Sequence, residues 1–260
     1  MDLQLTGKRA IVTGGSRGIG LAAATALIAE GARVAVVARD ADALDAAAQG
    51  IGAEPFSADT GSDESVRAMV DAVVERFGGV DVLVNAAARP ASAGQQLAAS
   101  ATSDDVVRAE LEIKVLGYLR CARAVAPHMT AQGWGRIVNV SGLNARRSTS
   151  LVGSVRNVAV ASMTSALAAE LGPHGVNVTV VHPGITVTEK TPAAVAAMAA
   201  AQDISEDEAM ASLTAGTTIG RLVTAAEVAD VIAFLCSPRS VAINGDAVAV
   251  GGGVPGVTYY

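Results

Sequence analysis

Cysteine is scarce in this sequence of 260 residues, where Cys121 and Cys236 stand far apart, with no CxxC pair and no histidine pair nearby. A disulfide framework needs several cysteines, and a structural zinc site needs clustered cysteine or histidine ligands. We therefore expect no metal site. Reduced cysteines also fit a protein of a reducing compartment, the cytoplasm.

The sequence has fewer basic than acidic residues, with 19 Lys and Arg against 25 Asp and Glu. Its formal charge is therefore −6. Nucleic acids and anionic membranes attract proteins through clustered basic side chains. No apolar run approaches the roughly 20 residues of a membrane span, and residues 1–5 carry no signal pattern. We expect no nucleic-acid or membrane partner, and a small-molecule substrate instead.

The pattern of apolar residues predicts the fold class. Apolar residues make up 51% of the chain, and short β-branched runs alternate with longer alanine-rich amphipathic stretches. This alternation predicts successive βαβ units in one α/β domain over 1–260, a Rossmann-like, doubly wound parallel sheet with helices on both faces. The expected strands cover about 9–13, 33–38, 80–85, 136–141, 177–182 and 246–250.

One stretch, 186–216, breaks this alternation. It is rich in alanine and small polar residues and follows Pro183-Gly184. Long connections in compact domains often carry binding functions. We interpret 186–216 as a helical lid over a substrate.

A glycine-rich turn follows the first expected strand and precedes an alanine-rich helix. Glycines permit the tight turn and let the backbone approach a pyrophosphate, which then lies at the positive end of the helix. This order of strand, turn and helix predicts a dinucleotide site. The residues of the turn expected to bind the cofactor are Gly14, Ser16, Arg17, Gly18, Ile19 and Gly20.

The end of the second expected strand indicates which dinucleotide is bound. Ala38 and Arg39 stand where an NAD-binding protein usually carries an acid for the ribose 2′-hydroxyl. The planar fork of arginine suits a phosphate, and Arg17 supplies a second cation. The sequence therefore favours NADP (NADPH) over NAD. The alternative is that both arginines are solvated surface side chains.

The segment TGGSRGIG at 13–20 resembles the TGxxxGxG cofactor turn of the short-chain dehydrogenase/reductase family, classical type. Further likenesses follow along nearly the whole chain: ADT at 58–60, LVNAAA at 83–88, HPGI from 182 and GRL at 220–222. Ala86 and Ala88 replace the family's second asparagine and its glycine. The resemblance implies further cofactor contacts from Asp59, Thr60, Asn85, Ala86, Asn157, Pro183, Gly184, Ile185 and Thr188.

The family's catalytic set is not matched. Members use an asparagine, a serine and a YxxxK motif, in which tyrosine passes the proton and lysine lowers the tyrosine pKa. By count, Gly153 and Asn157 occupy the YxxxK positions, Gly142 the serine position and Lys114 the asparagine position. No tyrosine of the chain is followed four residues later by lysine; the three are Tyr118, Tyr259 and Tyr260.

Lys114, Ser141 and Asn157 remain as the candidate catalytic residues. A buried Lys114 with a lowered pKa can act as an acid or base or form a Schiff base. Ser141 stands one residue before the family's serine position, and Asn157 can hydrogen-bond the nicotinamide ribose. His182 is a further candidate proton donor. The alternatives are a Lys114 paired with a nearby glutamate or exposed to water, and a purely structural His182.

Three functions remain open. The first is an NADP-dependent oxidoreductase that acts on an unknown carbonyl or alcohol by a non-standard proton route. The second is a degenerate dinucleotide-binding protein, a sensor or silent partner subunit, and a third is a cofactor-assisted lyase or isomerase using Lys114. The resemblance also implies a homo-oligomer, a dimer or homotetramer, formed through helices around 103–128 and 153–171 and the C-terminal strand.

Overall fold

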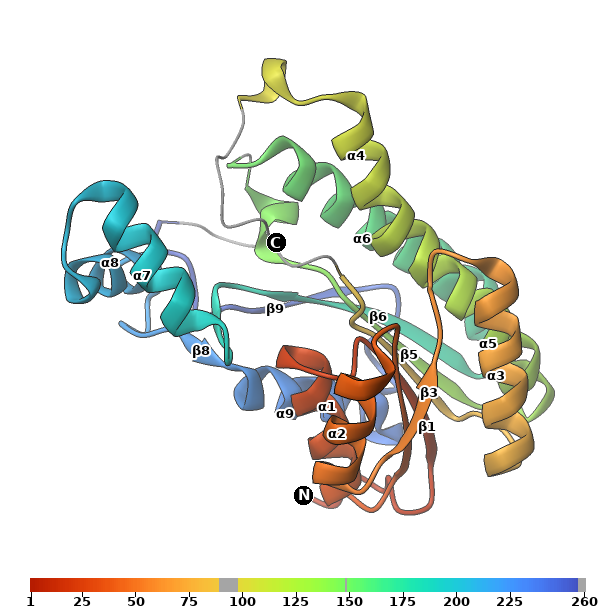
Figure 1. The fold of residues 1–260 in the computed structure, drawn as a ribbon. Helices are drawn as coiled ribbons and strands as arrows, with labels where there is room; N and C mark the ends of the chain where they lie inside the picture. Colours follow the sequence, from red (N-terminus) through yellow and green to blue (C-terminus); the bar gives the residue numbers. More distant parts are fainter. Residues whose placement is uncertain (89–97, 148, 257–260) are drawn as a thin grey trace.

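A seven-stranded parallel sheet forms the middle layer of the protein in a computed structural model that describes residues 1–88, 98–147 and 149–256 (Figure 1). The strand order is β3-β2-β1-β4-β5-β6-β9, and each neighbouring pair is parallel. The predicted α/β, Rossmann-like, doubly wound fold is confirmed. The strands are β1 Arg9–Thr13, β2 Arg33–Ala38, β3 Glu54–Ser57, β4 Val82–Asn85, β5 Gly135–Val140, β6 Val176–Pro183 and β9 Ala247–Val250.

The sequence predicted six of these strands and missed β3. The six expected strands are found, and their observed ends differ from the predicted ends by no more than two residues. β3 has only four residues and contains Pro55, which has no N–H to donate to a neighbouring strand. Proline is tolerated there because β3 is an edge strand that pairs only with β2. A proline within a short run is a poor strand signal, and this is why the pattern failed.

Helices cover both faces of the sheet and build two cores. α1 (Gly18–Ala29), α2 (Ala41–Ile51) and α9 (Ala225–Cys236) pack on one face, and α3 (Asp63–Phe77), α5 (Gly117–Ala131) and α6 (Leu151–Leu171) pack on the other. Successive strand side chains point to opposite faces, so Ile11 joins one core and Val12 the other. The central strands are therefore buried on both sides, as expected of a parallel sheet.

The order of the strands determines where a ligand can bind. From β1 the sheet extends one way to β2 and β3 and the other way to β4 and β5. In open α/β sheets, the crevice for a ligand lies beyond the carboxyl ends of the strands where the order reverses. The glycine turn follows β1 and Ala86 follows β4, so both lie at this point.

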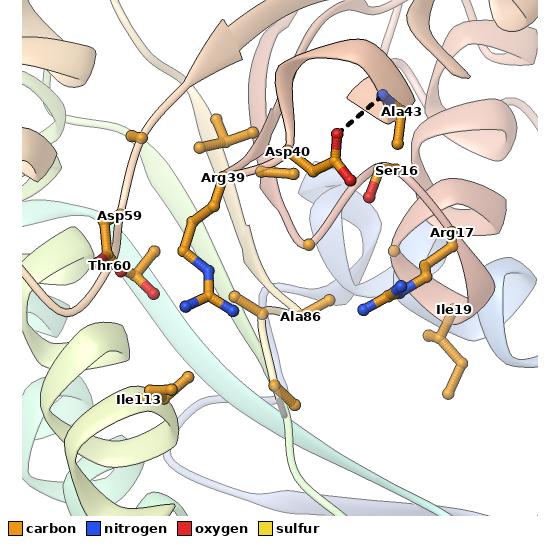
Figure 2. A pocket seen from close by; sticks show the side chains of 17 residues that line it. Ser16, Arg17, Ile19, Arg39, Asp40, Ala43, Asp59, Thr60, Ala86 and Ile113 are labelled. Atoms are coloured by element: carbon orange, nitrogen blue, oxygen red, sulfur yellow. Dashed lines mark hydrogen bonds between the residues drawn. The ribbon is translucent and has the colours of Figure 1, made fainter. Parts of the chain in front are cut away.

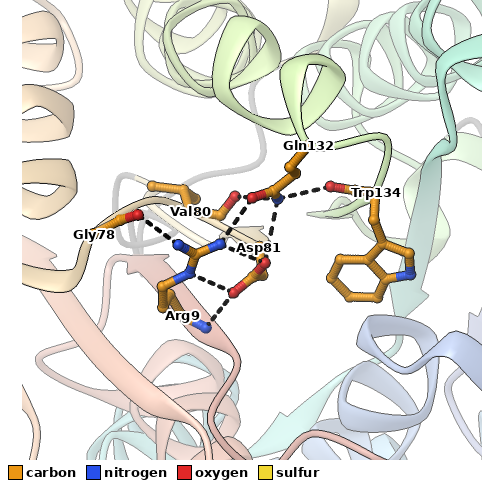
Figure 3. Close-up of polar contacts among 6 residues, drawn as sticks. All are labelled: Arg9, Gly78, Val80, Asp81, Gln132 and Trp134. Carbon is orange, nitrogen blue, oxygen red and sulfur yellow. Dashed lines mark hydrogen bonds and ion pairs between the residues drawn. The ribbon is translucent and has the colours of Figure 1, made fainter.

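A polar cluster joins the amino ends of the strands, away from that crevice (Figure 3). The Arg9 guanidinium donates two hydrogen bonds to the Asp81 carboxylate, at 2.7 and 2.8 Å, and another to Gly78 O. Gln132 donates to the carbonyl oxygens of Val80 and Trp134. Burial raises the pKa of Asp81, but the bonds from Arg9 outweigh it and the net pKa is lowered. Because these groups satisfy one another, the cluster is structural.

The stretch 186–216 is helical, as predicted. β7 (Thr186–Val187) pairs with β8 (Val223–Thr224), and α7 (Thr191–Gln202) and α8 (Glu206–Thr214) pack on each other through Val195, Ala199 and Ala209. In Figure 1 this helical pair stands out from the sheet on the side of β8. A role as a lid stays a prediction.

Helix α6 is unusually apolar for its exposure. With the turn that follows it, Leu151–His174 spans 24 residues at a mean hydropathy of 1.2, enough by length and composition to cross a membrane. This is weak evidence for a span, because core helices of soluble proteins pass the same test. Only 33% of its most apolar stretch is buried, so much of this apolar surface is not packed against the described residues.

Candidate cofactor cleft and active site

A cleft of about 370 Å³ lies at the predicted crevice, between the glycine turn, the end of β2 and the residues after β4 (Figure 2). Nine of the predicted cofactor residues line it: Gly14, Ser16, Arg17, Ile19, Gly20, Arg39, Asp59, Thr60 and Ala86. The other lining residues were not among the predicted cofactor contacts: Val37, Ala38, Asp40, Ala43, Ala58, Ala87, Ala88 and Ile113. These are mostly small side chains with little chemistry of their own, so only the three-dimensional fold shows their role.

The glycines of the turn are required by its close packing. Gly14 has φ +68, and a Cβ on it would lie 2.7 Å from Ala86 O. A Cβ on Gly20 would lie 2.2 Å from Gly14 O. The turn therefore lies against the end of β4 at a distance that only glycine permits, and it leaves the start of α1 open to a ligand phosphate.

Two arginines face the cleft without partners. Figure 2 shows the Arg17 and Arg39 side chains on its two sides, and neither guanidinium has a hydrogen bond or ion pair with the described residues. The neighbouring Asp40 instead accepts a hydrogen bond from Ala43 N–H at 3.2 Å and caps α2. The cleft thus offers two cations to an anionic group, as a 2′-phosphate requires.

The turn after β3 closes the far side of the cleft. Asp59 Oδ1 accepts a hydrogen bond from Gly61 N–H at 2.9 Å, and the Asp59 N–H donates to Ser65 Oγ at 3.0 Å. The carbonyl of Thr60 accepts a bond from Arg120 at 3.2 Å. These contacts fix the backbone of Asp59 and Thr60, two of the predicted cofactor residues that line the cleft.

Asn85 lies behind the cleft and does not line it. Its side chain is fully buried, and its Nδ2 donates to Asn139 Oδ1 at 3.0 Å and to Tyr118 O at 3.4 Å. Its Oδ1 has no partner among the described residues. Asn85 therefore ties β4 to β5 and α5, and its contribution to the cleft is the position of the backbone at Ala86.

Two further predicted cofactor residues, Gly18 and Thr188, meet at the start of α1. Gly18 donates its N–H to Glu189 Oε2 at 3.3 Å, and the Thr188 methyl lies 3.7 Å from the place of a Cβ on Gly18. Pro183 ends β6, Gly184 follows it, and Ile185 is exposed. The segment after β6 thus meets the glycine turn, although its residues do not line the cleft.

Lys114 lies in a π-helical turn, Glu112–Leu116, between α4 (Asp104–Leu111) and α5. Its side chain is buried, 5% exposed, and Nζ donates to Ser141 O at 2.9 Å. Burial, followed by the positive charge of Arg156, lowers the pKa of Lys114 to about 7, although Glu110 acts in the opposite sense. An amine with this pKa can gain or lose a proton near neutral pH. Of the alternatives left open by the sequence, the structure therefore shows the buried lysine, and its catalytic role stays a prediction.

Ser141 and Asn157 lie together behind Lys114. Ser141 Oγ donates to the carbonyl oxygen of Asn157 at 3.2 Å, so this hydroxyl ties β5 to α6. The Asn157 side chain is 3% exposed, and its Oδ1 has no partner among the described residues. This free acceptor is available to a hydroxyl donor, whereas the Ser141 hydroxyl is already engaged.

The space of the missing family residues is filled by other side chains. A Cβ on Gly142, the serine position, would lie 2.9 Å from Asn157 Nδ2. A Cβ on Gly153, the tyrosine position, would lie 2.7 Å from Asn144 Nδ2. The catalytic end has thus repacked around its substitutions. Asn144, which fills the place next to Gly153, carried no signal in the sequence beyond being polar.

His182 and Tyr118 are poor proton donors here. Burial, followed by the charges of Arg146 and Lys114, lowers the pKa of His182 to about 4, so its ring is neutral at pH 7. Its Nδ1 has no partner among the described residues. Tyr118 is buried and donates to Val140 O at 3.0 Å, and burial raises its pKa. Tyr259 and Tyr260 lie outside the described residues.

The ion pair between Arg156 and Glu110 was not expected from the sequence. It joins α6 to α4, and both side chains are 18% exposed. Arg156 immediately precedes Asn157, and its charge is one cause of the lowered Lys114 pKa. Only the packing of α4 on α6 brings these groups together, because they are 46 positions apart in sequence.

Known proteins are similar to this chain over nearly its whole length. A family model described as enoyl-(acyl carrier protein) reductase matches residues 14–255. The chain is 36% identical over 252 residues to the short-chain reductase protein NovJ of Streptomyces niveus, with 95% of this chain and 93% of the relative covered. It is 32% identical over 260 residues to a sorbitol dehydrogenase of Cereibacter sphaeroides, with 96% and 98% covered.

Two solved structures with NADPH have the same fold. An L-sorbose reductase from Gluconobacter frateurii, complexed with NADPH and L-sorbose, has a TM-score of 0.90 at 28% identity, with 99% of this chain and 100% of that chain covered. A variant actinorhodin polyketide ketoreductase with NADPH has a TM-score of 0.88 at 33% identity, with 96% and 98% covered.

Proposed function

This chain belongs to the short-chain dehydrogenase/reductase family, and on that premise we propose that it is an NADP-dependent oxidoreductase with a non-standard proton route. The observation that carries the proposal is the pair of unpartnered cations, Arg17 and Arg39, beside the glycine turn. Those two side chains would hold a 2′-phosphate, and the N–H groups at the start of α1 would hold the pyrophosphate. When bound, the nicotinamide supplies or accepts a hydride.

Lys114 is the proposed proton donor for carbonyl reduction. Its amine titrates near neutral pH, and it adjoins Ile113, which lines the cofactor cleft. Within the described part of the chain, one donor position of the protonated amine is engaged, by Ser141 O. Asn157 Oδ1 is the proposed acceptor for a hydroxyl of the nicotinamide ribose, because it is buried without a donor.

The substrate class proposed here is a ketone or its secondary alcohol. The similar proteins include a sorbitol dehydrogenase, an L-sorbose reductase and a polyketide ketoreductase, names that share the interconversion of a carbonyl with an alcohol. We further propose that the enzyme works in the cytoplasm, in keeping with its free, buried cysteines.

A second function is a dinucleotide-binding protein without turnover, a sensor or silent partner subunit. The observation in its favour is that Lys114 is enclosed by protein and the Ser141 hydroxyl is bonded to the backbone. An enzyme must bring its proton donor to the substrate, so a permanently enclosed Lys114 would favour this second function.

Turnover separates the two proposals. Purified protein is mixed with NADPH and a panel of ketones, aldehydes and sugars, and NADPH oxidation is followed by absorbance. Substrate-dependent oxidation that is lost in Lys114→Met supports the oxidoreductase with its lysine route. Tight NADPH binding with no oxidation across the panel supports the binding protein.

We also propose that the chain forms a homo-oligomer through α4 and α6. Leu151, Val155 and Val158 recur at helical spacing along α6 and are 40–50% exposed, and Val106 on α4 is 42% exposed. A continuous apolar face of this kind on a soluble protein marks an interaction surface. Sedimentation of the wild type as a dimer or tetramer, and of Val158→Glu as a smaller species, would support this. A monomeric wild type would refute it.

A further inference from the structure

Helix α1 begins beside the cofactor cleft, and the residue before it does not cap its first N–H groups. It begins at Gly18 and runs for 12 residues, and the side chain of its N-cap residue, Arg17, makes no capping bond. Its first turn contains no acidic residue. The first N–H groups of a helix lack partners within the helix and carry a partial positive charge.

An acidic side chain reaches this helix end from a distant part of the chain. The Glu189 carboxylate accepts a hydrogen bond from Gly18 N–H at 3.3 Å, across 171 positions of sequence. The preceding residue, Thr188, also lies next to Gly18, as described above. The carboxylate therefore binds a donor that the proposed function assigns to the cofactor's pyrophosphate.

Internal hydrogen bonds order the turn that carries Glu189. The Thr188 N–H donates to Thr191 Oγ1 at 2.9 Å, and the Thr191 N–H donates to Thr188 O at 3.0 Å. β7 pairs with β8 immediately before this turn, and α7 begins immediately after it. The turn that carries Glu189 is thus joined directly to β7 and α7.

We propose that Glu189 is a built-in competitor for the cofactor's phosphate groups, which occupies the end of α1 in the free protein and leaves it when the dinucleotide binds. The inference rests on the proposed function. A carboxylate and a phosphate group that approach the same N–H donor repel each other, because both are negatively charged. They therefore compete for the hydrogen bond from Gly18. The departure of Glu189 frees the turn from α1, so cofactor binding releases 186–216 to rearrange beside the site.

The test compares the NADPH dissociation constants of the wild type, Glu189→Gln and Glu189→Ala by fluorescence titration. Gln keeps the side-chain length without the charge, and Ala removes the acceptor altogether. We expect both variants to bind NADPH roughly five- to tenfold more tightly than the wild type. The matched control is Glu75→Gln, an equal change of charge at an exposed residue of α3 that bonds to none of the described residues. It is expected to leave the dissociation constant unchanged.

Adenosine 2′-monophosphate provides a second probe, because it carries the 2′-phosphate but no pyrophosphate. Its affinity is expected to be equal in the wild type and in Glu189→Gln. The inference would be overturned if the wild type binds NADPH and the Glu189 variants bind it no more tightly. The proposed function would then remain intact. Equal tightening for both ligands would also overturn the inference, because the effect would then be one of general charge. Absence of NADPH binding in every protein would overturn both proposals.

Discussion

In the cofactor cleft, the guanidinium groups of Arg17 and Arg39 have no partner among the described residues, whereas at the catalytic end Lys114 and Ser141 are each bonded to backbone oxygen. Exposed cations around a preformed cleft are ready for a ligand. Buried groups that are hydrogen-bonded within the protein stabilise the fold, in addition to any chemistry they perform. The resemblance to the family therefore predicts cofactor binding better than it predicts the route of the proton.

The two regions also differ in what a single substitution can change. Gly14 and Gly20 lie so close to neighbouring backbone that no side chain fits. Gly142 and Gly153 instead face the side-chain amides of Asn157 and Asn144. The cofactor turn is therefore fixed by backbone geometry, while the glycines of the catalytic end are confined by side chains that can move.

The largest expected effect is at the glycine turn. Gly14→Ala places a Cβ 2.7 Å from Ala86 O at a positive φ. We expect it to lower the free energy of unfolding by about 2–5 kcal/mol and to remove measurable NADPH binding, because left-handed backbone and overpacking both oppose it. Gly52→Ala is the control: it has a similar positive φ and open space around the new Cβ. Chemical denaturation and NADPH titration measure both, and equal losses in the two variants would contradict the expectation.

Substitution of Lys114 is expected to have the next largest effect. Lys114→Met preserves the length and apolar stem of the side chain, and we expect kcat for carbonyl reduction to fall about 10²- to 10⁴-fold with little change in NADPH affinity. In the wild type, reduction should slow as pH rises through about 7, because a proton donor must be protonated and the Lys114 pKa is about 7. A pH–rate profile without this step would remove Lys114 from the proton route.

A smaller effect is expected at the 2′-phosphate. Arg39→Ala is expected to weaken NADPH binding by about 10- to 100-fold, the value of a lost charge-assisted hydrogen bond, and to leave NADH binding nearly unchanged. Arg67→Ala, an exposed arginine of α3 paired with Asp63, serves as the control. Equal weakening of both cofactors would mean that Arg39 does not contact the 2′-phosphate.

The smallest effect is on how the free energy of unfolding depends on pH. The Lys114 pKa is lowered in the folded protein from 10.5 to about 7, so the unfolded chain binds more protons between these values. The free energy of unfolding should therefore rise with pH, by up to about 2 kcal/mol between pH 7 and pH 8.5. Lys114→Met should lack this slope. Urea denaturation of both proteins at the two pH values measures the difference, and parallel curves would show that Lys114 is not desolvated in solution.

The fold and the cofactor end could be predicted because local sequence determines them. A strand, a glycine turn and an alanine-rich helix are contiguous between 9 and 29, and their spacing alone predicts where a phosphate can bind. The ion pair of Arg156 with Glu110 and the contact of Gly18 with Glu189 depend on long-range packing, which no local pattern encodes. The hydrogen bond from Ser141 to the Asn157 carbonyl oxygen likewise depends on how the end of β5 meets α6, which no local pattern encodes.

We expect the cofactor end to be intact and to select the phosphorylated dinucleotide. Parallel fluorescence titrations of the purified wild type with NADPH and NADH test it most directly. We predict that NADPH binds at least about tenfold more tightly than NADH, since Arg17 and Arg39 gain a phosphate partner from NADPH alone. Equal binding, preference for NADH, or binding of neither cofactor would contradict the claim.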